Sequence, residues 1–143
     1  MKKSFPFILP ALFLLFLPSC KKYEDGPLFS LRSKKARVSN VWKVDYYSEN
    51  DVDKTQQYNN LYQQNQLVIE KSGAYLIHYL YQGNLDYTES GNWKFNDNKT
   101  AIIFYRTTPG TDTSDLRILR LKENELWLLD GDSVRKEYRL VPF

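Results

Sequence analysis

The sequence predicts an all-β protein that folds as an eight-stranded antiparallel up-and-down barrel. Residues 39–143 contain eight short runs of strand-forming residues, and breaks rich in Gly, Asn and Asp separate them. No stretch of ordinary helix length carries an apolar stripe with the 3.6-residue period of a helix. Most breaks span only two to four residues, so each joins neighbouring antiparallel strands. Closing the strands into a barrel removes the two edges that an open sheet would expose.

The first predicted strand covers residues 41–47, where Val, Trp and Tyr are frequent. A polar stretch at residues 48–65 follows, and its Gln, Asn and Tyr residues show little apolar periodicity, which predicts a long connection. Turns with Gly, Asn and Asp punctuate the rest of the chain. The other seven strands are predicted at residues 66–70, 74–81, 85–95, 100–107, 115–121, 125–129 and 134–141.

The amino-terminal segment has the pattern of an export signal. Two lysines precede an apolar run at residues 5–17, and these 13 residues are fewer than the about 20 that span a bilayer as a helix. The sequence "LPSC" at residues 17–20 resembles the lipobox of bacterial lipoproteins, in which the cysteine becomes the first mature residue and carries a lipid. The resemblance implies a membrane anchor on Cys20. The alternative is a free cysteine near an ordinary cleavage site.

The sequence "KKYED" at residues 21–25 resembles the surface-export signals of Bacteroidetes lipoproteins, in which acidic residues follow the cysteine. That resemblance implies an outer-membrane lipoprotein displayed on the cell surface, and the alternative is an anchor that faces the periplasm. Each buried methylene of an acyl chain contributes about 0.8 kcal/mol, so several chains hold a protein firmly. The domain itself then needs no membrane-binding face.

The charge of the chain is unevenly distributed. Residues 20–37 hold six basic and two acidic groups, whereas residues 38–143 hold 12 basic and 15 acidic groups. We therefore divide the chain into a signal peptide at 1–19, a lipidated basic tether at 20–38 and a barrel domain at 39–143. Residues 26–37 are either a solvated linker near anionic head groups or a docking segment for a partner. A nucleic-acid partner is not expected, because the body of the domain is acidic.

From about residue 39 to the end, the chain resembles the lipocalin-like lipoproteins of Bacteroidetes. The matching features are Trp42 in the first strand, "KSGAY" at 71–75, "SGNWKF" at 90–95, "RILRLKENELWLL" at 117–129 and the closing "EYRLVPF". The first strand reads "SNVWKV", where many relatives have a glycine before the tryptophan. The resemblance implies a calyx-like barrel of the calycin type and no settled activity.

Strand alternation places Tyr75, Ile77, Tyr79 and Tyr81 on one face of their strand and Leu76, His78 and Leu80 on the other. Ile102 and Phe104 likewise oppose Ala101, Ile103 and Tyr105, and Leu126 and Leu128 oppose Trp127 and Leu129. Several strands are therefore apolar or aromatic on both faces. A partner, a second subunit or the 48–65 segment is expected to cover part of the outer wall.

Eleven tyrosines in 143 residues suit a cavity for amphipathic ligands or sugar rings, because tyrosine joins a flat apolar ring to a polar tip. The alternative is that the tyrosines only fill strand positions, where they are favoured. We expect the 48–65 segment to act as a lid, and Trp42, Trp93 and Trp127 to fill the core. The candidate ligand-binding residues are Tyr58, Tyr62, Tyr75, Tyr79, Tyr81 and Tyr105.

The chain offers little material for catalysis. His78 is the only histidine, and no Ser-His-Asp arrangement, zinc spacing or glycine-rich phosphate loop is visible. The sequence "DGD" at 130–132 reads as a hairpin turn, since it lacks the further ligands of a calcium loop. We expect no enzyme activity, metal or cofactor. The sequence favours a binding module for a small apolar, amphipathic or glycan ligand, and the alternative is an accessory subunit of an outer-membrane secretion, uptake or assembly complex.

Overall fold

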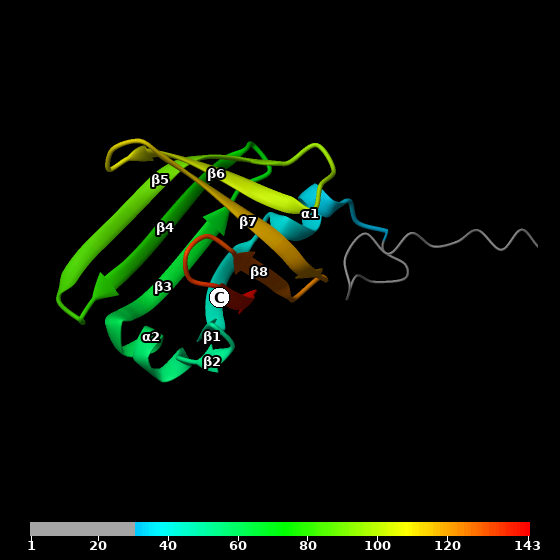
Figure 1. The fold of residues 1–143 in the computed structure, drawn as a ribbon. Coiled ribbons are helices and arrows are strands. Elements are labelled where there is room, and N and C mark those ends of the chain that lie inside the picture. The colour runs from blue at the N-terminus through cyan, green and yellow to red at the C-terminus, as the bar shows by residue number, and fades with distance from the viewer. Residues whose placement is uncertain (1–30) are drawn as a thin grey trace, which may run out of the picture.

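The computed structural model describes residues 31–143, and it confirms the predicted fold class (Figure 1). Eight antiparallel strands form a closed up-and-down barrel, in which each strand pairs with the next along the chain. The barrel strands are β1 (Val41–Glu49), β3 (Tyr62–Ile69), β4 (Ala74–Tyr81), β5 (Leu85–Phe95), β6 (Ala101–Thr108), β7 (Asp112–Leu121), β8 (Leu126–Asp130) and β9 (Lys136–Pro142).

Strand β1 closes the barrel because it pairs on both sides, with β9 and with β3. Its pairing with β9 runs from Trp42 to Glu49, whereas its pairing with β3 covers only Val41 and Trp42. Beyond that point the two strands diverge, and a side chain bridges them: the backbone N–H of Val44 donates to Oδ1 of Asn65 at 3.0 Å. The wall of the barrel is thus weakest between β1 and β3.

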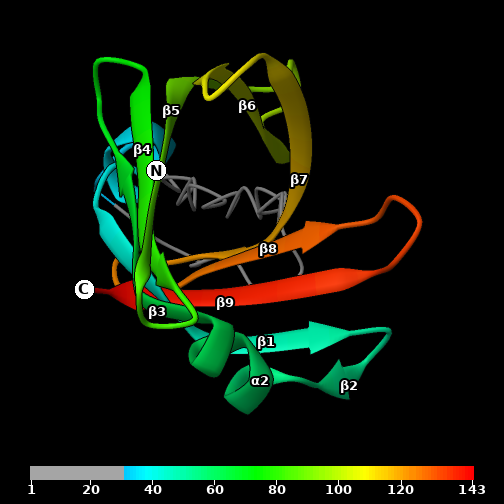
Figure 2. The same cartoon turned by 90° about the vertical axis from the view of Figure 1, so that its left-hand side faces the viewer.

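The 48–65 segment, predicted as a long connection, is largely ordered secondary structure. It contains the end of β1, the two-residue strand β2 (Val52–Asp53), the helix α2 (Thr55–Leu61) and the start of β3. Figure 2 shows α2 beside β1 and β3, where the two strands diverge. The sequence pattern missed α2 because none of its residues is buried, so the helix has no apolar stripe.

A second short helix, α1 (Lys34–Val38), packs against the opposite end of the barrel (Figure 1). Ser33 caps it by accepting a hydrogen bond from the backbone N–H of Ala36 at 3.1 Å. The Arg37 guanidinium donates to the carbonyl of Leu121 at 2.7 Å, and Val38 is fully buried. Residues 34–38 therefore belong to the folded body, and the prediction that they form part of the tether is wrong.

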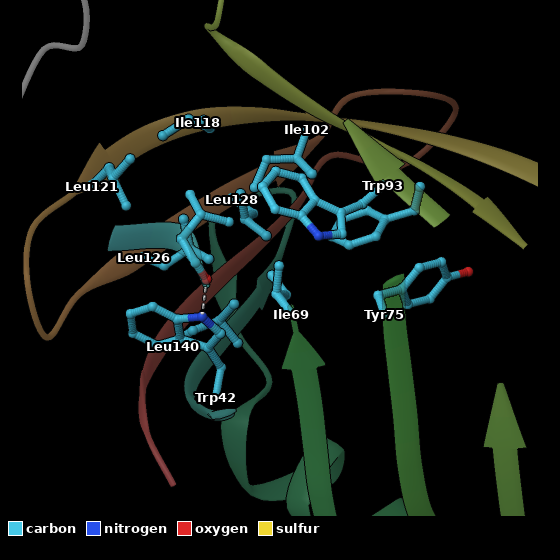
Figure 3. Packing of buried hydrophobic residues seen from close by; sticks show 12 residues of the cluster. Trp42, Ile69, Tyr75, Trp93, Ile102, Ile118, Leu121, Leu126, Leu128 and Leu140 are labelled. Carbon is cyan, nitrogen blue, oxygen red and sulfur yellow. Dashed lines mark hydrogen bonds between the residues drawn. The ribbon is translucent and has the colours of Figure 1, made fainter. Parts of the chain in front are cut away.

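The hydrophobic core fills the α1 end of the barrel (Figure 3). Trp42 is fully buried, and its indole N–H donates to the carbonyl of Val38 at 2.8 Å. Trp93 is 5 % exposed and packs beside Ile102, as expected for core residues. Trp127 departs from that expectation: its ring lies on the outer wall, between the guanidinium groups of Arg120 and Arg139 at 4.5 and 4.3 Å.

The two ends of the barrel differ in what they carry. The end with α1, which we call the closed end, also holds the connections at 70–73, 96–100 and 122–125 and residue Phe143. The other end, which we call the mouth, holds the segment from 50 to 61 and the connections at 82–84, 109–111 and 131–135. The core cluster lies at the closed end, so large side chains fill only one half of the interior.

The predicted signal peptide at 1–19, Cys20 and the tether up to residue 30 lie outside the described residues. Within residues 31–143, no helix combines the length and apolar character that crossing a membrane requires.

A substitution at Gly91 tests how closely the strands of the barrel wall pack. A Cβ at this position would lie 2.0 Å from the carbonyl oxygen of Tyr105 and 2.9 Å from Cε1 of Tyr75, so Gly91→Ala forces the backbone apart. We expect the free energy of unfolding, measured by urea denaturation, to fall by about 1–3 kcal/mol. Gly131→Ala is the control, because a Cβ there meets no atom within 4 Å. Equal stability of the two variants would contradict this account of the wall.

Candidate functional site

The half of the barrel interior toward the mouth contains a cavity of about 430 Å³. This volume lies within the range of about 300–1,000 Å³ that is typical of small-molecule sites. The barrel is therefore hollow at one end and filled at the other. Side chains from seven strands and from α2 line the cavity, with β6 as the one barrel strand that contributes none.

Aliphatic side chains form the part of the cavity that adjoins the core. They pack directly against the buried cluster or belong to it, so this surface is continuous with the core of the closed end. It offers no hydrogen-bond partners and favours an apolar group of a ligand. We call these residues the apolar floor: Val44, Leu67, Ile77, Leu116, Leu128 and Leu140.

Six tyrosines surround the cavity above this floor, and we call them the tyrosine belt: Tyr138, Tyr47, Tyr58, Tyr62, Tyr79 and Tyr87. Each ring contacts the next in that order, with centroids 5.0, 4.8, 4.7, 5.1 and 4.7 Å apart. These spacings are typical of favourable aromatic pairs, so the rings support one another as a chain. The belt runs from β9 through β1, α2, β3 and β4 to β5.

Helix α2 supplies the one ring of the belt that does not come from a strand. The helix is held at its start, where the backbone N–H of Lys54 donates to the carbonyl of Tyr47 at 2.9 Å. The side chain of Asp53 accepts from the backbone N–H of Thr55 at 2.8 Å, and this hydrogen bond lowers the pKa of Asp53. Tyr58 then places its ring between those of Tyr47 and Tyr62, across the gap where β1 and β3 diverge.

The structure distributes the six predicted ligand-binding tyrosines over four environments. Tyr58, Tyr62 and Tyr79 line the cavity together. Tyr75 is 3 % exposed and belongs to the core, while Tyr81 contacts Tyr62 at 5.8 Å without lining the cavity. Tyr105 lies apart from the cavity, and its ring faces the Lys94 ammonium at 5.3 Å.

Sequence reasoning missed three members of the belt, Tyr47, Tyr87 and Tyr138. The signal for Tyr87 was its alternation with Glu89, which also lines the cavity. For Tyr47, the signal is obscured by an irregularity of the β1–β9 pairing between Val44 and Tyr46. That extra residue turns Tyr47 to the cavity, whereas strict alternation from Val44 would have chosen Tyr46.

Three carboxylates line the cavity together with the tyrosines. Glu89 accepts hydrogen bonds from the hydroxyls of Tyr75 at 2.8 Å and Tyr87 at 3.2 Å, and the Arg106 guanidinium lies 3.5 Å away. Asp130 pairs with the Lys136 ammonium at 3.6 Å. Glu49 accepts a hydrogen bond from the hydroxyl of Tyr47 at 2.6 Å.

Burial raises the pKa of four tyrosines of the belt. Desolvation raises the pKa of Tyr79 and of Tyr138 to about 12, and nearby tyrosines and carboxylates contribute to both increases. The pKa values of Tyr47 and Tyr58 are raised further above their ordinary value of 10.0, again chiefly by burial. The hydroxyls of these four tyrosines are thus neutral at ordinary pH and able to donate and accept hydrogen bonds.

The histidine singled out in the sequence lies away from the cavity. His78 belongs to the outer face of β4, where its Nε2 is 2.8 Å from Oδ1 of Asp86 in the neighbouring strand. Among residues 31–143, no group of three or more His, Cys, Asp or Glu side chains is arranged to hold a metal ion.

Comparisons with known proteins identify no family for this chain. Neither a scan against protein-family models nor a search of curated proteins found a match to this sequence.

The raised pKa values of the belt predict a loss of stability at alkaline pH. Between pH 10 and 12 the unfolded chain releases tyrosine protons that Tyr79 and Tyr138 keep in the folded state. The stabilisation is therefore complete below pH 10 and is lost as the pH rises through 12. We expect the free energy of unfolding, measured by urea denaturation at several pH values, to fall over this interval. Tyr138→Phe should reduce the slope, and an unchanged slope would count against the buried belt.

Proposed function

We propose that this protein is a lipid-anchored outer-membrane lipoprotein whose barrel binds a small apolar, amphipathic or glycan ligand. The observation that carries the proposal is the cavity of about 430 Å³, with an apolar floor on one side and a belt of neutral tyrosines on the other. A site with these two surfaces suits a ligand with an apolar body and a polar end, because each part meets its own kind of surface.

The membrane part of the proposal rests on the sequence "LPSC" at 17–20 and on the acidic residues that follow it. The position of α1 supports it, since the chain joins the barrel at the closed end. A tether that leaves from that end allows the mouth to be presented away from the membrane. Attachment then leaves access to the cavity free.

Helix α2 serves as the lid of the site in this proposal. It covers the section of wall where β1 and β3 share no ladder hydrogen bonds, and it contributes no buried residue to the core. Displacing it requires breaking the ring contacts of Tyr58 and the hydrogen bonds that join Lys54 and Thr55 to the backbone of Tyr47 and Leu61 to Gln82. No buried apolar contact of the helix has to be broken as well, and segments with few such contacts are those that open most readily in proteins.

A cavity-filling variant tests the binding function. Ile77 lines the cavity, whereas its neighbour Leu76 points outward and is 37 % exposed. We expect Ile77→Trp to weaken binding of the neutral fluorescent probe N-phenyl-1-naphthylamine by at least about tenfold, which corresponds to about 1.4 kcal/mol. Leu76→Trp adds the same side chain outside and should leave probe binding unchanged.

The measurement is a titration of probe fluorescence, with thermal unfolding by circular dichroism to establish that both variants are folded. If the unmodified protein fails to bind the probe, or if both variants bind it equally, the cavity does not serve as the binding site.

An accessory role in an outer-membrane complex is the second candidate. It is favoured by an apolar row on the outer wall, where Val41 pairs with Val68 and Val68 pairs with Leu76. Val41 and Leu76 are each 37 % exposed, and a partner would remove this surface from water.

Purification of the full chain in mild detergent tests this role. An outer-membrane protein should co-purify in stoichiometric amount, and Leu76→Glu should abolish its recovery, because the substitution places a charge in the apolar row. Isolation of the chain alone would argue against the accessory role.

A further inference from the structure

We infer that the cavity selects a small organic cation, a molecule with an ammonium head and an apolar tail. The inference rests on the proposed binding function, and it adds the charge of the ligand. It is carried by the net charge of the lining, by the one carboxylate that lacks a basic partner, and by the aromatic rings beside that carboxylate.

The lining of the cavity carries a net negative charge. Three carboxylates face it, from Glu49, Glu89 and Asp130, while Lys136 is the only basic residue that lines it among residues 31–143. Field lines from these charges are concentrated in a cavity with low-dielectric walls, so a cation is attracted and an anion is repelled. A fatty-acid-like ligand with a carboxylate head is therefore disfavoured.

The three carboxylates differ in whether their charge is already compensated. Glu89 lies beside the Arg106 guanidinium, and Asp130 lies beside the Lys136 ammonium. Glu49 lies opposite Lys136 in the β1–β9 ladder, but the Lys136 ammonium pairs with Asp130, and among residues 31–143 no Lys, Arg or His nitrogen lies within 4.0 Å of the Glu49 carboxylate. The hydrogen bond of Glu49 comes from the neutral hydroxyl of Tyr47. Its negative charge thus remains available to a ligand.

The surroundings of Glu49 suit an ammonium group. The carboxylate is tied to Tyr47, whose ring contacts those of Tyr58 and Tyr138 at 4.8 and 5.0 Å. All three rings line the cavity, and each offers an electron-rich face that attracts a cation, most strongly where water is excluded. A carboxylate next to tyrosine faces supplies both the charge and the aromatic surface that bind quaternary ammonium groups.

Gln66 and Ser114 also line the cavity, but the apolar floor makes up the larger part of the remaining lining and favours an apolar tail over a sugar. The floor consists of six aliphatic side chains, which would leave sugar hydroxyls without hydrogen-bond partners. Asn65, an amide in the lining, already uses its oxygen for the backbone of Val44 and its nitrogen for the carbonyl of Tyr62. An alkyl or aromatic tail fits this surface, with the ammonium head toward Glu49.

Three ligands with the same tail and different heads test the inference: octyltrimethylammonium, octanoate and octyl glucoside. Titration calorimetry of the full chain in low salt should rank the cation first, by at least about tenfold over both others. Added salt should weaken binding of the cation and leave that of the glucoside nearly unchanged, because ions screen the charge of the head.

A matched pair of variants locates the charge responsible. Glu49→Gln removes the uncompensated carboxylate and keeps its shape, and it should reduce the affinity for octyltrimethylammonium by about tenfold with little effect on octyl glucoside. Asp45→Asn changes the net charge by the same amount on the same strand, but Asp45 is exposed and does not line the cavity. It should leave all three affinities unchanged.

The outcomes separate this inference from the proposed function. Equal or tighter binding of octanoate or octyl glucoside would overturn the selection for cations while the binding function stands. A preference for the cation that survives Glu49→Gln, or that Asp45→Asn lowers equally, would overturn the role of Glu49. Failure of all three ligands to bind would overturn the proposed function, and the inference with it.

Discussion

The buried indole of Trp42 is the contact on which the remaining structure depends. Its N–H donates to the carbonyl of Val38, which fixes α1 across the closed end. Its backbone belongs to both ladders of β1, since Trp42 pairs with Leu67 of β3 and with Pro142 of β9. One residue therefore ties together the helix that covers the end, the core beneath it and the closure of the barrel.

That arrangement also explains why the other half is hollow. Because the largest buried side chains gather around Trp42, the barrel needs no filling near its mouth to stay closed. Away from Trp42, β1 and β3 separate, and α2 with its Tyr58 ring covers the gap. Near the mouth, contacts between the tyrosine rings hold the wall together and leave the cavity open. An aliphatic core in the same place would fill the cavity.

Much of the fold follows from the sequence, because strand periodicity and short polar turns leave an up-and-down barrel as the simplest topology. The alternation of β4 placed Ile77 and Tyr79 on the same face, and the structure shows that this face lines the cavity. The sequence failed where both faces of a strand are apolar or aromatic, as with Phe104 inside and Tyr105 outside, and where α2 lacks an apolar stripe. Which face of such a strand points inward depends on the strand register and, in β1, on the irregularity between Val44 and Tyr46. The local sequence pattern encodes neither of them.

The separation of the two ends has a consequence for how such a protein diversifies. The connections at 82–84, 109–111 and 131–135 border the mouth and contribute nothing to the buried cluster. Changes in the length or composition of these connections should therefore alter the free energy of unfolding only slightly, because the core of the closed end supplies most of it. New ligand preferences can thus arise from changes in these three connections while the buried cluster of the closed end stays the same.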